Sequence, residues 1–178
     1  TLTGRKNLEC VMDALLTLSE QGRPVPDLVL AGARRKRAEE YVGQDRFAAL
    51  RGKVHFCRDP NQTELHALYE NALALVIPSY MEGWGLPLGE ALWVGTPALA
   101  STAPALREAG GDLARYFDPG KPEELAALID QLQSDPQMLQ TLKDDIRAAR
   151  PTLRSWQDVA RDILGAVRTH CAVSGPKT

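Results

Sequence analysis

Cysteine is scarce in this sequence, and its few positions do not suit a disulfide or zinc framework. The chain of 178 residues holds three cysteines, Cys10, Cys57 and Cys171, which lie far apart and form no C-x-x-C pair. The three histidines show no ligand spacing either. We therefore expect no metal site, and thiols that are reduced and mostly buried, as in a cytoplasmic protein.

Long apolar runs and runs of like charge are also missing. No apolar run reaches the length of a membrane span, and the N-terminal residues show no signal-peptide pattern. Peripheral association with the inner face of a membrane stays open as an alternative. The formal net charge is −2, with no run of five like charges, which is not typical of a nucleic-acid-binding protein. We interpret the one basic cluster, Arg34 to Arg37, as a solvated helix face.

The composition is that of a folded domain. The sequence is 44% hydrophobic and 25% charged, which is enough apolar surface for a core in one domain of ordinary size. We expect residues 1–152 to form this domain. Residues 153–178 are expected to form a C-terminal helix, with a frayed tail from residue 173 onward.

Short apolar runs alternate with amphipathic segments along the chain. Strands are predicted at residues 27–32, 53–57, 73–78, 97–101 and 115–118. Helices are predicted at residues 7–22, 37–52, 63–72, 87–95, 118–134 after an opening turn, onward to about 150, and 155–171. Unbroken apolar strands bounded by helices indicate a parallel sheet covered on both faces, which is a Rossmann-like, doubly wound α/β fold.

Several local features are predicted within these helices. The apolar face of the first helix consists of Leu8, Val11, Met12, Leu15 and Leu18. Gly43 weakens the second helix, Thr63 is the expected N-cap of the third, and Pro87 is the expected first residue of the fourth. Trp93 and Trp156 lie on amphipathic helices, so we expect both to pack in the core.

The opening of the chain lacks a strand. Residues 1–9 form a loop that leads directly into a helix, whereas in a doubly wound sheet such a loop follows the first, central strand. We therefore expect a strand upstream of Thr1, inserted between the strands at 27–32 and 73–78. Those two strands should then not pair directly, because the central strand supplies their backbone partners.

A Gly/Pro-rich turn follows the third predicted apolar strand, at the edge where open parallel sheets bind ligands. Gly83 and Gly85 allow the backbone to approach a ligand closely and to adopt positive φ. The helix beginning near Pro87 offers free N–H groups and a partial positive charge to an anion. The sequence therefore predicts a phosphate cradle here.

Charged residues surround this cradle. Arg5 and Lys6 precede the first helix and can converge on the same anion, which suits a diphosphate that becomes a leaving group. Glu90 lies one turn into the helix and can accept hydrogen bonds from a ribose diol. Glu82 lies before the glycines, where it can hold sugar hydroxyls. Two carboxylates flanking a phosphate cradle describe a site for a nucleoside diphosphate sugar.

Other interpretations of these residues exist. Residues 83–89 read G-x-G-x-x-x-G, one residue longer than the fingerprint of dinucleotide-binding oxidoreductases, and they follow a late strand rather than the first. Another alternative is a non-catalytic nucleotide-sugar-binding or regulatory domain. The presence of Lys6 and both glutamates argues against the loss of catalytic residues that such a domain would show. Taken alone, Glu90 could merely favour the helix macrodipole.

Several segments resemble the C-terminal, donor-binding domain of retaining glycosyltransferases of the GT-B fold, in particular family 4 (glycosyl transferases group 1). They are "RKN", "ALVIPSYMEGWGLPLGEALWVGTPAL", "PALREAGGDLARYFDPGKPEELAALI" and "SWQDVA". The match extends from Gly4 to about Val167. Two departures are Trp84, where phenylalanine is usual, and the absence of the glycine that usually follows the strand ending at Cys57.

The resemblance implies roles for individual residues. Arg5 and Lys6 match the basic pair that stabilises the departing diphosphate. Glu82 matches the glutamate that contacts the donor sugar near its reacting face, and Glu90 the one that binds the ribose. The remaining donor contacts would come from Gly83, Trp84, Gly85, Leu86, Pro87, Leu88, His55 and Phe56.

The resemblance also implies an activity. The protein would transfer a hexose from a nucleoside diphosphate sugar, with GDP-mannose favoured, to an acceptor hydroxyl with retention. The setting would be bacterial polysaccharide or lipopolysaccharide assembly, without metal or cofactor. A saccharide or lipid-linked acceptor would bind an N-terminal domain absent from this chain, so the segment alone would be inactive.

Overall fold

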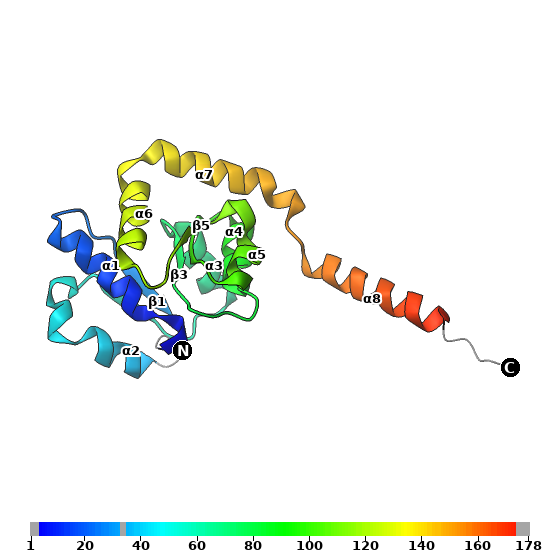
Figure 1. Cartoon of the computed structure of the whole chain (residues 1–178), viewed down its shortest axis with the longest axis horizontal. Helices are drawn as coiled ribbons and strands as arrows, with labels where there is room; N and C mark the ends of the chain where they lie inside the picture. Colours follow the sequence, from blue (N-terminus) through cyan, green and yellow to red (C-terminus); the bar gives the residue numbers. More distant parts are fainter. Residues whose placement is uncertain (1–3, 33–34, 174–178) are drawn as a thin grey trace.

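The computed structural model describes residues 4–32 and 35–173, and these residues form an α/β fold (Figure 1). The strands are β1 (Leu28–Ala31), β2 (Val54–Cys57), β3 (Leu75–Ile77), β4 (Ala98–Ser101) and β5 (Arg115–Phe117). The α-helices are α1 (Leu8–Glu20), α2 (Arg35–Val42), α3 (Gln62–Asn71), α4 (Leu86–Val94), α5 (Pro104–Gly110), α6 (Pro122–Ser134), α7 (Pro136–Ala149) and α8 (Trp156–Val173). The 3₁₀ turns are η1 (Gly4–Lys6), η2 (Asp45–Leu50), η3 (Gly111–Leu113) and η4 (Arg150–Thr152).

All strand pairs in the described residues are parallel. β1 pairs with β2, and β3, β4 and β5 form a second, three-stranded sheet in that order. Across the described part of the chain, β1 and β3 share no ladder hydrogen bonds. The prediction that these two strands do not pair directly is therefore confirmed, while the strand expected between them stays a prediction.

Helices lie on both sides of the strands, as in a doubly wound fold, but the strands are covered unequally. All four residues of β4 are buried, whereas Val29 and Ala31 of β1 are exposed, so the predicted cover on both faces holds for β4 and not for β1. Figure 1 shows α1 beside α6 on one side and α4 beside α5 on the other, and both pairs are in contact. The predicted apolar face of α1 is buried at all five positions. α4 contributes Leu88 and Leu92 to the same core, and β5 contributes Phe117. The parallel α/β fold predicted from the sequence is confirmed.

The helices differ from the predictions in four places. The helix predicted at 37–52 is two pieces, α2 and η2, separated at Gly43, where glycine makes continued helix costly. The N-cap of α3 is Asn61 rather than Thr63: Asn61 Oδ1 accepts from Glu64 N at 3.0 Å, and Glu64 Oε2 accepts from Asn61 N at 2.8 Å. This capping box fixes the start of the helix two residues earlier.

α4 and α5 account for the other two differences. Pro87 is the second residue of α4, because Gly85 is the N-cap and Leu86 the first helical residue. The short helix α5 was not predicted. It buries Leu106 and packs against α4.

The two tryptophans are more exposed than predicted. Trp93 lies at the surface, with the Arg150 guanidinium 5.3 Å from its ring centroid. Trp156 is 73% exposed, because α8 extends away from the other elements (Figure 1). Three further large apolar side chains of α8 are exposed: Ile163, Leu164 and Val167. The prediction that both tryptophans pack in the core is wrong.

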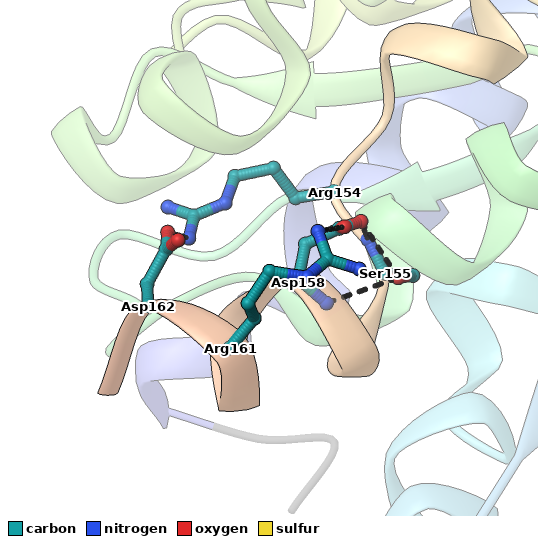
Figure 2. Close-up of polar contacts among 5 residues, drawn as sticks. All are labelled: Arg154, Ser155, Asp158, Arg161 and Asp162. Atoms are coloured by element: carbon teal, nitrogen blue, oxygen red, sulfur yellow. Dashed lines mark hydrogen bonds and ion pairs between the residues drawn. The ribbon is translucent and has the colours of Figure 1, made fainter. Parts of the chain in front are cut away.

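α8 is stabilised locally at its N-terminus. Figure 2 shows Ser155 and Asp158 bonded reciprocally: Ser155 N donates to Asp158 Oδ2 at 2.9 Å, and Asp158 N donates to Ser155 Oγ at 3.2 Å. Arg161 pairs with Asp158 at 2.9 Å, and Arg154 pairs with Asp162. The bonds from Ser155, followed by those from Arg161, lower the pKa of Asp158 to about 2. These contacts cap the helix without tertiary packing.

The remaining predictions on composition have mixed outcomes. Cys10 is buried and Cys57 half-buried, and both are free thiols, while the side chain of Cys171 lies outside the described residues. Burial raises the pKa of Cys10 to about 12, which makes it unreactive. Arg34 of the basic cluster and residues 174–178 of the tail lie outside the described residues. No helix in the described ranges is long and apolar enough to cross a membrane.

Candidate functional site

Two loops that are far apart in the sequence meet at the carboxyl ends of the strands. One is η1, which leads into α1, and the other joins β3 to α4. Tyr80 N donates to Arg5 O at 2.9 Å, so the two backbones are in direct contact. Lys6 Nζ donates to Glu82 Oε1 at 2.5 Å, across 76 residues of sequence. The structure therefore brings together the two loops that carry the predicted charges.

Glu82 is held as a carboxylate. Its side chain is only 10% exposed. Burial alone raises its pKa, but hydrogen bonds from Lys6 and Ser79, with the charges of Lys6 and Arg5, lower the pKa below 4.5. Ser79 Oγ donates to Glu82 Oε1 at 2.7 Å. Both donors use Oε1, and Oε2 has no hydrogen-bond partner within the described residues.

Two serines, Ser79 and Ser101, help to position this carboxylate through hydrogen bonds. Ser79 is fully buried, and its carbonyl accepts a hydrogen bond of 2.5 Å from Ser101 Oγ at the end of β4. The bond ties the β3–α4 loop to the neighbouring strand. Glu82 is thus positioned by the sheet itself and not only by its own loop. The sequence prediction did not include either serine.

Asn7 joins the η1 loop to two other strand ends, and the sequence prediction missed this role. Its backbone is left-handed, with φ 52° and ψ 48°, and the residue is 5% exposed. Nδ2 donates to Pro78 O at 3.1 Å and to Pro119 O at 2.8 Å. Asparagine directly before an apolar helix and after two charged residues is the available signal, because asparagine tolerates the left-handed region.

The two predicted glycines of the turn differ. Gly85 is the N-cap of α4, with φ 84°, and a Cβ there would lie 2.9 Å from Leu106 Cδ2. Glycine is required at Gly85 by both conformation and space. Gly83 lacks positive φ, and nothing lies within 4 Å of a Cβ built on it. The expectation of positive φ is therefore correct for Gly85 and wrong for Gly83.

The N-terminus of α4 offers fewer backbone donors than expected. Leu88 N already donates to Gly85 O at 2.9 Å, and Gly89 N donates to the same oxygen at 3.3 Å. Pro87 has no N–H. The N–H groups of Gly85 and Leu86 have no backbone partner among the residues described. An anion at this helix end would therefore meet Gly85 and Leu86 first. The side chains of Trp84 and Leu86 are exposed beside them.

Glu90 has a partner of its own. It lies on the exposed side of α4, where its Oε2 accepts a hydrogen bond of 3.0 Å from Tyr69 Oη of α3. Arg5, within η1, is also exposed. The described contacts do not link Glu90 to the pair formed by Lys6 and Glu82. Glu90 is therefore a second carboxylate, held separately from Glu82, on α4.

The predicted contacts from β2 are not joined to these loops. His55 is exposed, and its Nε2 lies 3.4 Å from Asp27 Oδ1. Asp27 immediately precedes β1. Since Asp27 precedes β1, this imidazole faces the amino ends of the strands, away from Lys6. Phe56 is half-buried within β2 and packs against the core.

A cleft lies beside η1 and the β3–α4 loop. It has a volume of about 340 Å³, and its lining residues are Gly4, Asn7, Leu8, Glu9, Tyr41 and Tyr80.

Within the described ranges, no group of three or more His, Cys, Asp or Glu side chains is placed to hold a metal ion. The chemical groups at this edge are thus cations, carboxylates and backbone donors, which suit binding of an anion joined to a polyhydroxyl compound.

Comparisons with known proteins give this site a family. The chain matches the family described as Glycosyl transferases group 1 over residues 1–149. It is 39% identical over 110 residues to MMP alpha-(1->4)-mannosyltransferase of Mycolicibacterium hassiacum, covering 60% of this chain and 27% of that protein. It is 28% identical over 160 residues to O-antigen chain mannosyltransferase B of Escherichia coli, covering 90% of this chain and 37% of that protein.

The fold agrees with this family. Sucrose-phosphate synthase from Thermosynechococcus elongatus superposes with a TM-score of 0.82 at 26% identity, covering 96% of this chain and 43% of that one. The chain thus spans about a quarter to two fifths of the length of these proteins. The match covers most of the chain, and the charged loops and the helix N-terminus lie within it. The chain belongs to the glycosyl transferases group 1 family, and its α/β architecture is that of the GT-B glycosyltransferases.

Proposed function

We propose that this chain is the donor-binding part of a glycosyltransferase that transfers a hexose from a nucleoside diphosphate sugar to an acceptor hydroxyl, with retention of configuration. The observation that carries the proposal is the contact between Lys6 and Glu82, which joins the two loops at the strand ends. A cation and a carboxylate beside the N-terminus of α4 supply groups for a diphosphate and for sugar hydroxyls.

The cations act on the leaving group. Transfer breaks the bond between the anomeric carbon and the diphosphate oxygen, and the electron pair stays on the diphosphate. Lys6, Arg5 and the N–H groups at the start of α4 stabilise the charge that grows there. Because that charge is largest in the transition state, these groups accelerate the reaction more than they tighten donor binding.

The acceptor hydroxyl attacks from the face that the diphosphate leaves. Its oxygen forms the new bond to the anomeric carbon, which passes through an oxocarbenium-like state. The departing diphosphate oxygen lies on the same face and takes the hydroxyl proton. The reaction as proposed uses no metal ion or cofactor, because the cationic side chains and the helix end neutralise the diphosphate.

The two carboxylates bind different parts of the donor. Lys6 and Ser79 both occupy Oε1 of Glu82, so Oε2 is placed to accept a hydrogen bond from a sugar hydroxyl. Glu90 lies further along α4 and accepts from the ribose diol. Gly85 and Leu86, which lie between them in the sequence, would contact the sugar and the diphosphate through their backbone N–H groups.

The proposed donor is GDP-mannose, and the proposed setting is bacterial polysaccharide or lipopolysaccharide assembly. Two relatives carry mannosyltransferase names, and one of them is named for the O-antigen chain. The acceptor, a saccharide or a lipid-linked saccharide, would bind a part of the protein outside this chain. We place the enzyme in the cytoplasm. If its acceptor is lipid-linked, it would act at the inner face of the membrane.

Calorimetric titration of the protein with GDP, UDP and ADP tests the proposal. We expect GDP to bind most tightly, and GDP-mannose to be turned over in the presence of EDTA by the intact protein. Tighter binding of UDP or ADP would overturn GDP-mannose as the proposed donor but would still support a nucleotide-sugar site. Failure of all three nucleotides to bind would overturn the proposed function, and binding without turnover would favour the non-catalytic alternative.

A further inference from the structure

The Glu90 carboxylate is held by a tyrosine of the neighbouring helix. Tyr69 Oη of α3 donates to Glu90 Oε2 at 3.0 Å. Tyr69 is 9% exposed, whereas Glu90 lies at the surface of α4. Within residues 4–32 and 35–173, no second hydrogen-bond or ion-pair partner of this carboxylate is found. The direction of the Glu90 side chain therefore depends on a buried hydroxyl.

The two helices that carry this pair are tied together. Thr96, which is buried between α4 and β4, donates from Oγ1 to Tyr69 O at 2.7 Å. Its backbone N–H donates to Ala91 O at 2.8 Å. Thr96 thus joins the C-terminal ends of α3 and α4. The distance between Tyr69 and Glu90 is set by packing and not by the carboxylate alone.

The roles in this hydrogen bond are fixed. Burial, followed by the bond to Glu90 and the charge of Glu90, raises the pKa of Tyr69 far above its ordinary value of 10. The hydroxyl therefore keeps its proton at neutral pH, and it donates to the carboxylate. A carboxylate accepts up to about four hydrogen bonds, so Glu90 keeps Oε1 and part of Oε2 for a ligand.

We infer that Tyr69 is a positioning residue, which aims the Glu90 carboxylate at the ribose diol of the donor nucleotide. The inference rests on the proposed donor site. A glutamate on an exposed helix face otherwise samples many rotamers, and it must give up that freedom when it binds a ligand. The Tyr69 hydroxyl restricts these rotamers before the nucleotide arrives, and preorganisation of this kind increases affinity.

A purely structural role predicts a different result. If the Tyr69 hydroxyl only links α3 to α4, its removal lowers the stability of the protein and changes the affinity for all nucleotides alike. If it aims Glu90 at the ribose, its removal weakens only ligands that carry ribose hydroxyls. Nucleotides with and without these hydroxyls therefore separate the two roles.

The experiment compares Tyr69→Phe with wild type in the intact protein. Calorimetry would measure the affinity for GDP, UDP and ADP and for their 2′,3′-dideoxy forms. For the nucleotide that binds wild type, we expect Tyr69→Phe to lower affinity about three- to tenfold, and the dideoxy form to lose little. Tyr116→Phe is the matched control, because its hydroxyl donates to Gly111 O and Leu106 O instead. Tyr116→Phe should leave the preference for ribose unchanged.

A double variant tests whether Tyr69 acts through Glu90. In a Glu90→Ala background, Tyr69→Phe should have no further effect on nucleotide affinity. Equal losses for the ribose and dideoxy forms, or a full loss that persists without Glu90, would overturn the inference. If wild type binds a nucleotide and Tyr69→Phe keeps the full preference for ribose, only this inference fails. If wild type binds none of the three nucleotides, the proposed function fails first.

Discussion

Lys6 Nζ donates to Glu82 Oε1 at 2.5 Å, and Ser79 Oγ donates to the same oxygen at 2.7 Å. Two donors from different loops thus fix one carboxylate oxygen, and the ammonium group is held in place by its partner. A diphosphate at the N-terminus of α4 would meet a cation that is already oriented. Preorganisation of this kind is what makes electrostatic stabilisation effective.

Replacement of Lys6 should therefore reduce turnover more than donor binding. In Lys6→Met, kcat should fall about 10²- to 10³-fold, the usual cost of removing one preorganised group that stabilises developing charge. The donor KM should change much less. Lys53→Met is the matched control, since Lys53 pairs with Asp27 near the amino ends of the strands. A rise in KM with unchanged kcat would show that Lys6 binds the ground state only.

The stability contribution of Glu82 should depend on pH. Burial raises its pKa, but the bonds from Lys6 and Ser79 lower the pKa below 4.5 in the folded state. A lowered folded-state pKa means that the stabilisation is present above the unfolded value and is lost as pH falls through the folded value. Urea unfolding should show wild type more stable than Glu82→Gln at pH 7, with a gap that narrows below about pH 4.5. An equal gap at pH 7 and pH 3 would contradict this.

The two glycines of the turn should respond differently to alanine. Gly85→Ala forces a side chain into φ 84° and within 2.9 Å of Leu106 Cδ2. We expect a loss of about 1–3 kcal/mol of unfolding free energy, together with weaker nucleotide binding as the start of α4 shifts. Gly83→Ala, with open space and no positive φ, is the control and should change unfolding free energy by less than about 0.5 kcal/mol. Similar losses in both variants would contradict the assigned geometry.

Asn7 should contribute to stability through both conformation and hydrogen bonding. Asn7→Ala removes the donors to Pro78 O and Pro119 O and places alanine in the left-handed region. The expected loss is about 2–4 kcal/mol. Asn7→Gly keeps the conformation accessible, so it should recover about 1 kcal/mol of that loss. Equal unfolding free energies for the two variants would show that the left-handed backbone is not strained.

Much of the fold followed from apolar periodicity. The apolar run that became β4 is buried at all four residues, whereas Val29 and Ala31 of β1 are exposed, so an unbroken apolar run did not guarantee burial on both faces. The face of α1 from Leu8 to Leu18 is buried as expected. Periodicity reveals that a helix has an apolar face but not what covers it, which is why Trp156 was misplaced. Asn61 and Thr63 are both good N-caps, and Glu64 decided between them through its bond to Asn61 N.

The site was predictable where its residues follow the strand ends of a parallel sheet. Glu82 and Gly85 share a turn, and sheet topology brings that turn beside Lys6. Ser79 gave no local signal, because its role depends on Glu82 and on Ser101 from another strand. Tyr69 was missed for the same reason: its hydroxyl reaches Glu90 through the packing of α3 against α4. Supporting contacts of this kind are set by tertiary structure.

Calorimetric titration of one nucleoside diphosphate into wild type, Glu82→Ala and Glu90→Ala tests the central claim most directly. Both variants replace a glutamate that is fixed by a hydrogen-bond donor, so each serves as the control for the other. Affinity for the bare nucleotide should fall for Glu90→Ala, by roughly 1.5–3 kcal/mol for a lost charged hydrogen-bond site, and stay nearly unchanged for Glu82→Ala. The reverse order would contradict the assignment of ribose to Glu90 and sugar to Glu82.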